Sequence, residues 1–220
     1  MDGCDDGTSE IVLQMAKQYS RLVPLVYPNR LGKGGALIEG FRHAKGDYLV
    51  MLDADGPTPP EGLYRLIREA KSYDLVIGSR YMKDSKILVK EPLPRIFLSR
   101  AFNILVRLMF RRLRKFRDTQ CGVKVLRRDA LEKIGKDLLI TDLAFDVNLI
   151  YSTALNGFKV REVGITWRHE EGGSKVRGLL NVSIKMLLSL IRLRIYYSRL
   201  KPILESKIMR RISEFIYGRV

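Results

Sequence analysis

Short apolar runs alternate with helical patterns in the first half of the chain. Residues 48–52 are all apolar and are followed at once by turn residues, and residues 75–78 repeat this pattern. A run of this kind is typical of a strand buried on both faces of a parallel sheet. Residues 25–27 give a weaker copy, and helices are predicted over 35–44 and 60–72. The order predicts an α/β fold with an open, mostly parallel sheet flanked by helices.

The second half of the chain is richer in basic helices. Residues 95–115 and 179–197 both place apolar residues at helical spacing among Lys and Arg. Helices of this kind are typical of a bilayer surface, where the cations face anionic head groups. Between them, the pattern predicts a helix over 144–156 and a strand over 160–167. We therefore expect two amphipathic interface helices beside the sheet.

The charge of the chain is large and unevenly distributed. The sequence holds 40 Lys and Arg residues and 24 Asp and Glu residues, which gives a net charge of +16. Eight basic and no acidic residues lie between Arg95 and Arg117, and eleven basic and two acidic residues lie between Lys175 and Val220. A polyanionic partner is therefore expected. Neither stretch contains the roughly 18 apolar residues of a membrane-spanning helix, so we expect no span within this chain.

Length and composition indicate a folded protein. The 220 residues, 46% of them hydrophobic, are enough for one large domain or two small ones. Two cysteines are too few for a disulfide framework or a four-cysteine zinc site. We expect a main domain over 1–175, which includes the first interface helix, and a basic helical segment over 176–220.

Two carboxylates follow the first buried strand. Asp53 and Asp55 lie where ligands bind in open α/β sheets, at the carboxyl end of a strand. Such a pair can hold Mg²⁺ or Mn²⁺ on the diphosphate of a nucleotide, although a solvated turn has the same composition. The two histidines, His43 and His169, are far apart in the sequence, and we expect each to be a surface or structural residue.

Other polar residues suit phosphate groups. The glycine-rich turn over 29–35 leads into a helix and offers backbone amides and Lys33, although a plain strand-to-helix loop is an equal alternative. Arg80 follows the second buried strand. Arg95 and Ser99 lie one helical turn apart on one face of a predicted helix.

Several short motifs follow one another in order along the chain. They are Asp5-Asp6-Gly7, Asn29-x-x-Gly32-Lys33-Gly34, Asp53-Ala54-Asp55-Gly56, Gly78-Ser79-Arg80, Asp118-Thr119-Gln120-Cys121-Gly122, Ala144-Phe145-Asp146-Val147 and Gly173-Ser174-Lys175. In this order they resemble glycosyltransferase family 2. The resemblance runs from Asp5 to about Tyr197. It is greatest to the branch of dolichyl-phosphate β-glucosyltransferases, with dolichyl-phosphate mannose synthases next.

The resemblance implies a fold, substrates and a location. The fold would be GT-A, a Rossmann-like α/β arrangement, and the enzyme would be an inverting, metal-dependent hexosyltransferase that uses Mg²⁺ or Mn²⁺. It would move glucose from UDP-glucose, or alternatively mannose from GDP-mannose, to a polyprenyl (dolichyl) phosphate. Such an enzyme would bind peripherally at the anionic cytoplasmic face of a membrane and act in protein glycosylation.

The resemblance also implies three groups of site residues. The residues for the donor and its metal would be Asp6, Lys33, Asp53, Asp55, Arg168 and Lys175. The acceptor phosphate would bind Arg80, Arg95, Ser99 and Ser174, with Arg168, Ser174 and Lys175 on a loop that closes on the donor. The catalytic residues would be Asp118, Asp55 and Arg80. Since a phosphate monoester is already largely ionised at pH 7, Asp118 is interpreted as an orienting group rather than as a base.

The sequence departs from the family pattern at its start. Family members place a strand, a helix and a second strand before the Asp-Asp-Gly turn, whereas only four residues precede Asp5 here. We therefore expect an N-terminally truncated sheet, for which three explanations stay open: the recorded start is too late, a segment was lost, or a second copy or a partner chain supplies the missing strands. Pro57 stands where mannose synthases have glutamine, so metal binding of that type is not supported.

Two alternatives remain open beside the active enzyme. The first is an inactive, membrane-associated remnant of a transferase, which the short N-terminus would explain. The second is a nucleic-acid-binding protein, since a strongly basic chain also suits phosphate backbones. The arginines alternate with large apolar residues at helical spacing, which favours lipid, and no nucleic acid is expected as a partner.

Overall fold

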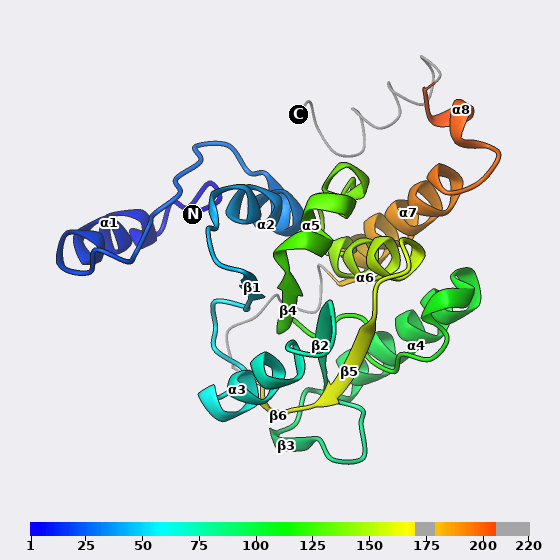
Figure 1. Cartoon of the computed structure of the whole chain (residues 1–220), viewed down its shortest axis with the longest axis horizontal. Helices are drawn as coiled ribbons and strands as arrows, with labels where there is room; N and C mark the ends of the chain where they lie inside the picture. Colours follow the sequence, from blue (N-terminus) through cyan, green and yellow to red (C-terminus); the bar gives the residue numbers. More distant parts are fainter. Residues whose placement is uncertain (170–178, 206–220) are drawn as a thin grey trace.

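The computed structural model describes residues 1–169 and 179–205 of the chain. Its centre is a four-stranded sheet in the order β1-β4-β2-β5, formed by Tyr48–Met51, Lys124–Arg127, Leu75–Ser79 and Val160–Gly164 (Figure 1). Strand β4 is antiparallel to both β1 and β2, and β2 is parallel to β5. Three of the four strands therefore share one direction. The expected α/β class is confirmed, and the sheet is mixed.

Helices cover both faces of this sheet. The described helices are α1 (Thr8–Gln18), α2 (Gly32–His43), α3 (Pro60–Glu69), α4 (Leu93–Met109), α5 (Arg128–Ile134), α6 (Phe145–Leu155), α7 (Leu179–Tyr196) and α8 (Lys201–Glu205). Helix α3 lies on one face, and α2, α4, α5, α6 and α7 lie on the other. Short 3₁₀ turns, η1 (Arg111–Leu113) and η2 (Gly135–Asp137), follow α4 and α5. Strands β3 (Lys86–Val89) and β6 (Thr166–Arg168) form a separate two-stranded parallel sheet.

The alternation of side chains along β2 separates two cores. Leu75 and Ile77 point into the larger core, which α2, α4, α5, α6 and α7 complete. Val76 points the other way, into a smaller core that α3 covers with Leu66. Successive residues of a strand face opposite sides of the sheet, so one apolar run can serve both layers. Strand β2 is thus buried on both faces, as the run at 75–78 predicts. The same prediction for 48–52 is wrong, because β1 lies at the edge of the sheet and exposes Tyr48 and Val50.

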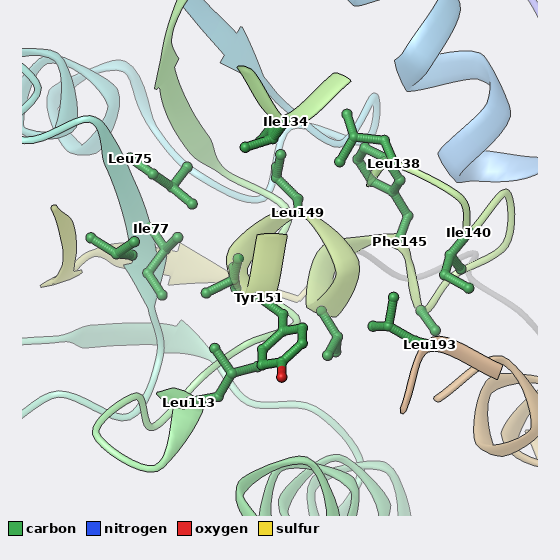
Figure 2. Close-up of a cluster of buried hydrophobic side chains, with 14 of the residues drawn as sticks. Leu75, Ile77, Leu113, Ile134, Leu138, Ile140, Phe145, Leu149, Tyr151 and Leu193 are labelled. Carbon is green, nitrogen blue, oxygen red and sulfur yellow. The ribbon is translucent and has the colours of Figure 1, made fainter. Parts of the chain in front are cut away.

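Helix α6 is the centre of the larger core. Every residue from Phe145 to Thr153 is buried, which is typical of a helix enclosed on all sides. Figure 2 shows Leu149 and Tyr151 of this helix among side chains from β2 and the surrounding helices. Helix α7 adds Met186, Leu190 and Leu193 to the same core, so the described start of segment 176–220 packs against the expected main domain. The division at residue 175 stays a prediction.

Some element boundaries differ from those expected. The strand predicted at residues 25–27 is wrong, because Tyr27 makes only one isolated parallel bridge, with Asp2. A strand needs a continuous ladder of backbone hydrogen bonds, and no described segment extends this bridge. The predicted helix over 95–115 instead begins at Leu93 and ends at Met109, before η1. The predicted strand over 160–167 divides into β5 and β6.

The N-terminal segment contacts the rest of the protein sparsely. Helix α1 buries none of its residues and extends away from the sheet and its helices (Figure 1). Strand β1 forms one edge of the sheet, where Leu49 and Met51 are buried while Tyr48 and Val50 are exposed. Among the described helices, none has both the length and the apolar character needed to cross a membrane.

Candidate active site

A pocket of about 540 Å³ opens where β1 and β2 end. Six residues selected from the sequence line it, namely Lys33, Asp53, Asp55, Arg80, Arg95 and Ser99. Ligands of open α/β sheets bind at this position, beyond the carboxyl ends of the strands. The walls come from segments far apart in the sequence, since helices α4 and α7 both contribute side chains to the lining. The structure therefore brings the predicted donor and acceptor groups to one cavity.

In the part of the pocket predicted to bind the donor, Lys33 on α2 forms ion pairs with Asp53, which follows β1, and with Asp146 on α6. Its Nζ lies 3.1 Å from Asp53 Oδ1 and 3.2 Å from Asp146 Oδ2. The other oxygen of Asp146 pairs with Nζ of the buried Lys124 at 2.5 Å. Burial alone would lower the pKa of Lys33, but Asp146 and Asp53 outweigh it and raise the pKa, so the ammonium group stays charged. Asp146 and Lys124 had no role assigned from the sequence.

Four backbone amides of the glycine-rich turn donate hydrogen bonds within the chain. The N–H groups of Gly34 and Gly35 donate to the carbonyl of Thr141, at 2.8 and 3.2 Å. Those of Leu31 and Gly32 donate to the carboxylate of Asp2. These four donors are already satisfied within the chain, which favours the alternative of a plain strand-to-helix loop. Lys33 is the group of this turn that lines the pocket.

The glycines of this turn allow close packing. Gly32 has a φ of 78°, in the left-handed region that favours glycine. A Cβ atom on Gly34 would lie 2.3 Å from the carbonyl oxygen of Ile140. The motif thus places the start of α2 directly against residues 140–141, and Lys33 gains its position beside Asp146 from that contact.

The two carboxylates after β1 differ in their surroundings. Asp53 packs directly on Gly122, where a Cβ atom would lie 1.7 Å from Asp53 Oδ2. Asp55 is exposed and makes no hydrogen bond or ion pair with the rest of the described chain.

His169, expected to be a surface or structural residue, is half-buried, lines the same pocket and stacks on Trp167.

These residues can hold a divalent cation only together with a ligand. Within residues 1–169 and 179–205, no three His, Cys, Asp or Glu side chains are grouped closely enough to hold a metal ion by themselves. Mg²⁺ is commonly bound by one or two carboxylates, with phosphate oxygens and water completing its shell. Asp53 and Asp55 supply oxygen donors of that kind at the rim of the pocket, so they fit a metal that arrives with a diphosphate.

In the part of the pocket predicted to bind the acceptor, Asp118 forms a bidentate ion pair with Arg80. Arg80 Nε donates to Asp118 Oδ2 at 2.8 Å and Nη2 donates to Oδ1 at 3.0 Å. The Arg80 backbone N–H also donates to Oδ2, at 3.0 Å. Asp118 is fully buried, and burial alone would raise its pKa, but Arg80 outweighs this effect and holds the pKa below its ordinary value. A carboxylate so engaged is suited to orienting Arg80.

Two polar residues that the sequence did not indicate hold the Asp118 loop. The carboxylate of Glu162, on β5, accepts hydrogen bonds from the backbone N–H groups of Arg117 and Asp118. Asn103 Oδ1, on α4, accepts from the backbone N–H of Thr119 at 2.8 Å and from its hydroxyl at 2.9 Å. The position of Asp118 is thus fixed from both the sheet and the helix.

Two predicted site residues that the structure describes, Asp6 and Arg168, lie outside the pocket lining, and two others fall outside the described residues. Asp6 is exposed at the start of α1, where its carboxylate accepts a hydrogen bond from the Thr8 backbone N–H at 3.1 Å. Arg168 is exposed at the end of β6 and is not part of the lining. Ser174 and Lys175 lie outside the described residues. The roles expected for these four residues stay predictions.

Comparison with known proteins identifies the family to which this α/β chain belongs. Residues 1–135 match the model of glycosyl transferase family 2, and the chain belongs to that family.

Two of the following three curated relatives are named for glucosyl transfer, and the third is named as a glycosyltransferase. The chain is 32% identical over 203 residues to dolichyl-phosphate beta-glucosyltransferase ALG5D of Trichomonas vaginalis, with 89% of this chain and 60% of that protein covered. It is 32% identical over 214 residues to dolichyl-phosphate beta-glucosyltransferase of Saccharomyces cerevisiae, with 89% and 63% covered. It is 36% identical over 191 residues to glycosyltransferase AglD of Haloferax volcanii, with 84% and 30% covered. The chain thus spans less than two thirds of each of these relatives.

Solved structures confirm the GT-A fold. Glucosyl-3-phosphoglycerate synthase of Mycobacterium tuberculosis, in complex with Mn²⁺, UDP-glucose and phosphoglyceric acid, matches with a TM-score of 0.60 and 16% identity, over 87% of this chain and 66% of that one. Mannosyl-3-phosphoglycerate synthase of Rubrobacter xylanophilus matches with a TM-score of 0.59 and 18% identity, over 92% and 63%.

Proposed function

We propose that this chain carries the active site of an inverting hexosyltransferase that moves glucose from UDP-glucose to a polyprenyl phosphate. The observation that carries the proposal is the pocket itself, whose lining includes both the carboxylates Asp53 and Asp55 and the arginines Arg80 and Arg95. A metal diphosphate and an anionic acceptor would thus meet in one cavity. The names of the curated relatives support glucose and dolichyl phosphate, and mannose from GDP-mannose is the second candidate.

The donor would bind at the carboxylate side. Asp53 and Asp55 would hold Mg²⁺ or Mn²⁺, and the metal, when bound, neutralises charge on the leaving diphosphate. Lys33 stays charged and adds a fixed positive group beside Asp53. The Mn²⁺ and UDP-glucose in the glucosyl-3-phosphoglycerate synthase structure support this type of donor site.

The acceptor phosphate would bind at the arginine side. Arg95 is half-buried, and in the described chain Glu91 is its one ionic partner, through Nε, which leaves both Nη groups for a ligand. The Ser99 hydroxyl lies one helical turn away and accepts a hydrogen bond from the Tyr81 hydroxyl at 3.1 Å. Since the phosphate monoester is already ionised, the protein needs to position it and to neutralise charge rather than to remove a proton.

The lipid part of the acceptor would follow the apolar wall of the pocket. Helices α4 and α7 supply this wall with Leu98, Phe102, Val182 and Met186. On its outer side, α4 exposes a stripe of large apolar residues, among them Leu93 at 80% and Phe97 at 76% exposure. The stripe continues through Ile104 and Leu108, between arginines. We therefore propose that α4 lies at the cytoplasmic surface of an anionic membrane, where the enzyme binds peripherally.

A transfer assay tests the proposal. The protein is incubated with radiolabelled UDP-glucose or GDP-mannose, Mg²⁺ or Mn²⁺, and a polyprenyl phosphate, and label is then measured in the organic phase. We expect organic-phase label from UDP-glucose, strongly reduced in Asp55→Asn and Arg95→Gln variants and unchanged in Glu132→Gln, which alters an exposed residue of α5. Label that stays in the aqueous phase in every combination would refute the proposal for this chain.

A binding assay tests the membrane surface separately. Vesicles with anionic lipid should co-sediment the protein, and a Phe97→Glu variant should reduce this binding because it places a charge in the exposed stripe. A salt-sensitive shift of nucleic acid without vesicle binding would instead favour the nucleic-acid alternative.

A further inference from the structure

A carboxylate lies between the two arginines of the proposed acceptor site. Glu91 Oε1 is 3.1 Å from Arg95 Nε, and Glu91 Oε2 is 3.4 Å from Arg80 Nη1. Glu91 is only 8% exposed and lines the pocket, just before the start of α4. Neither the motifs nor the roles implied by the family resemblance include this residue.

The charges around the two arginines already balance without a ligand. Arg80 and Arg95 carry two positive charges, and Asp118 and Glu91 carry two negative ones. Arg80 is held mainly by Asp118, which is fully buried behind the pocket and bound through both oxygens. Glu91 makes longer contacts and faces the cavity. An anion that enters the pocket therefore competes with Glu91, while the Asp118 pair stays intact.

We propose that Glu91 is a displaceable counter-ion that sets the affinity of this site for phosphate. It holds the guanidinium groups of Arg80 and Arg95 in the empty pocket and gives up part of its contact when a phosphate monoester binds. This inference rests on the proposed function, because it takes the two arginines as the acceptor site. Glu91 acts through the arginines and is thus a positioning residue.

The competition between Glu91 and the phosphate for the two arginines changes during the reaction, because the charge of the phosphate changes. A phosphate monoester carries between about −1.5 and −2 at pH 7 and outcompetes a single carboxylate for two guanidinium groups. Transfer of the sugar makes the phosphate a diester with one negative charge. Glu91 carries the same charge as this product and is tethered beside it, so it can return to Arg95. The carboxylate thus weakens the binding of both anions, and its return to Arg95 favours release of the product.

Binding of simple phosphates tests this role without any nucleotide sugar. Inorganic phosphate represents the monoester, and dimethyl phosphate represents the diester product. Calorimetry at pH 8 compares the wild type, Glu91→Gln, and the control Glu132→Gln, which removes the same charge at an exposed position on α5. We expect Glu91→Gln to bind both anions about tenfold more tightly than the wild type, because one nearby negative charge is gone. The control should bind them as the wild type does.

The opposite outcome has a clear meaning. If Glu91 only keeps the arginines in place, its loss disorders them and Glu91→Gln binds phosphate more weakly or equally, which overturns the proposal. Should the variant not fold, a structure of the wild type with inorganic phosphate decides the matter. We expect the Glu91 Oε1 to Arg95 Nε distance to lengthen beyond 3.1 Å, and phosphate bound with both Glu91 ion pairs unchanged overturns the proposal. These binding measurements use no nucleotide sugar, so they can be interpreted even if the protein transfers no sugar.

Discussion

Replacement of Asp118 by Asn tests whether the buried ion pair with Arg80 holds the acceptor side of the pocket. Asn keeps the shape of Asp but loses the charge that faces Arg80 Nε and Nη2. Asp118 is fully buried, so water does not replace the lost interaction. Arg80 then keeps Glu91, at 3.4 Å from Nη1, as its remaining ionic partner.

The magnitude follows from the cost of leaving a buried charge without its partner. Removing one member of a buried pair destabilises a protein by about 3–5 kcal/mol. Glu91 offsets part of this loss, so we expect about 3 kcal/mol for Asp118→Asn. For a chain of this size that corresponds to a fall in Tm of roughly 6–12 °C. Asp84→Asn is the matched control, because Asp84 pairs with Arg65 at the surface and its loss should cost under about 1 kcal/mol.

The pH dependence gives an independent check of the same pair. The pKa of Asp118 is lowered in the folded protein. Its stabilisation is therefore fully present above the unfolded pKa of about 4 and is lost as the pH falls through the folded value. Urea unfolding at several pH values should show a constant difference between wild type and Asp118→Asn near pH 7. This difference should shrink when the pH falls below about 4.

Two results would refute this reasoning. One is an equal free energy of unfolding for wild type and Asp118→Asn at pH 7, and the other is a difference that does not change at acid pH. A double-mutant cycle with Arg80→Gln locates the effect, because the double variant should be less destabilised than the sum of the single variants by about 1–3 kcal/mol.

Three further predictions concern residues around the same pocket. Gly122→Ala should lower the affinity for UDP with Mn²⁺, because its Cβ atom would displace the carboxylate that follows β1, and unchanged affinity in calorimetry would contradict this. Burial raises the pKa of the Cys121 thiol to about 12, so iodoacetamide at pH 8 should modify only the exposed Cys4 unless urea is added, as mass spectrometry can show. Lys124→Met should destabilise the fold by about 3 kcal/mol in urea unfolding, because it leaves the buried carboxylate of Asp146 with one cation fewer, and wild-type stability would exclude that role.

The strands that lead to the pocket could be predicted because each carries its signal locally. The runs at 48–52 and 75–78 are apolar throughout and end at turn residues, and both are strands in the structure. Strand β4 could not be found in this way, because it begins with Lys124. That lysine is buried only because Asp146, 22 residues further along the chain, neutralises it. A local pattern of apolar residues cannot show such a pair.

The same distinction applies to the site. Lys33, Asp53 and Arg80 lie at strand or helix ends that the pattern reveals, and the structure brings them to one pocket. Glu162, which fixes the Asp118 loop, lies 44 residues from Asp118 in the sequence and gives no local signal. Asp6 stands in a matching motif but lies on the N-terminal segment, outside the pocket. Motifs thus selected several charged residues of the lining, while the residues that hold them in place could be found only from tertiary contacts.

The residues that fix the shape of the pocket make more contacts within the protein than the residues that are available to bind a ligand. Asp118 lies behind the cavity and is saturated by Arg80. Asp55 and Arg95 both line the pocket, are more exposed than Asp118, and keep acceptor or donor atoms that the described residues do not use. An ion pair within the protein must be broken before its groups can bind a ligand, so ligand binding costs less free energy at Asp55 and Arg95 than it would at Asp118. The buried pair of Asp118 and Arg80 then fixes the shape of the pocket, and Asp55 and Arg95 would bind the two substrates of the proposed reaction.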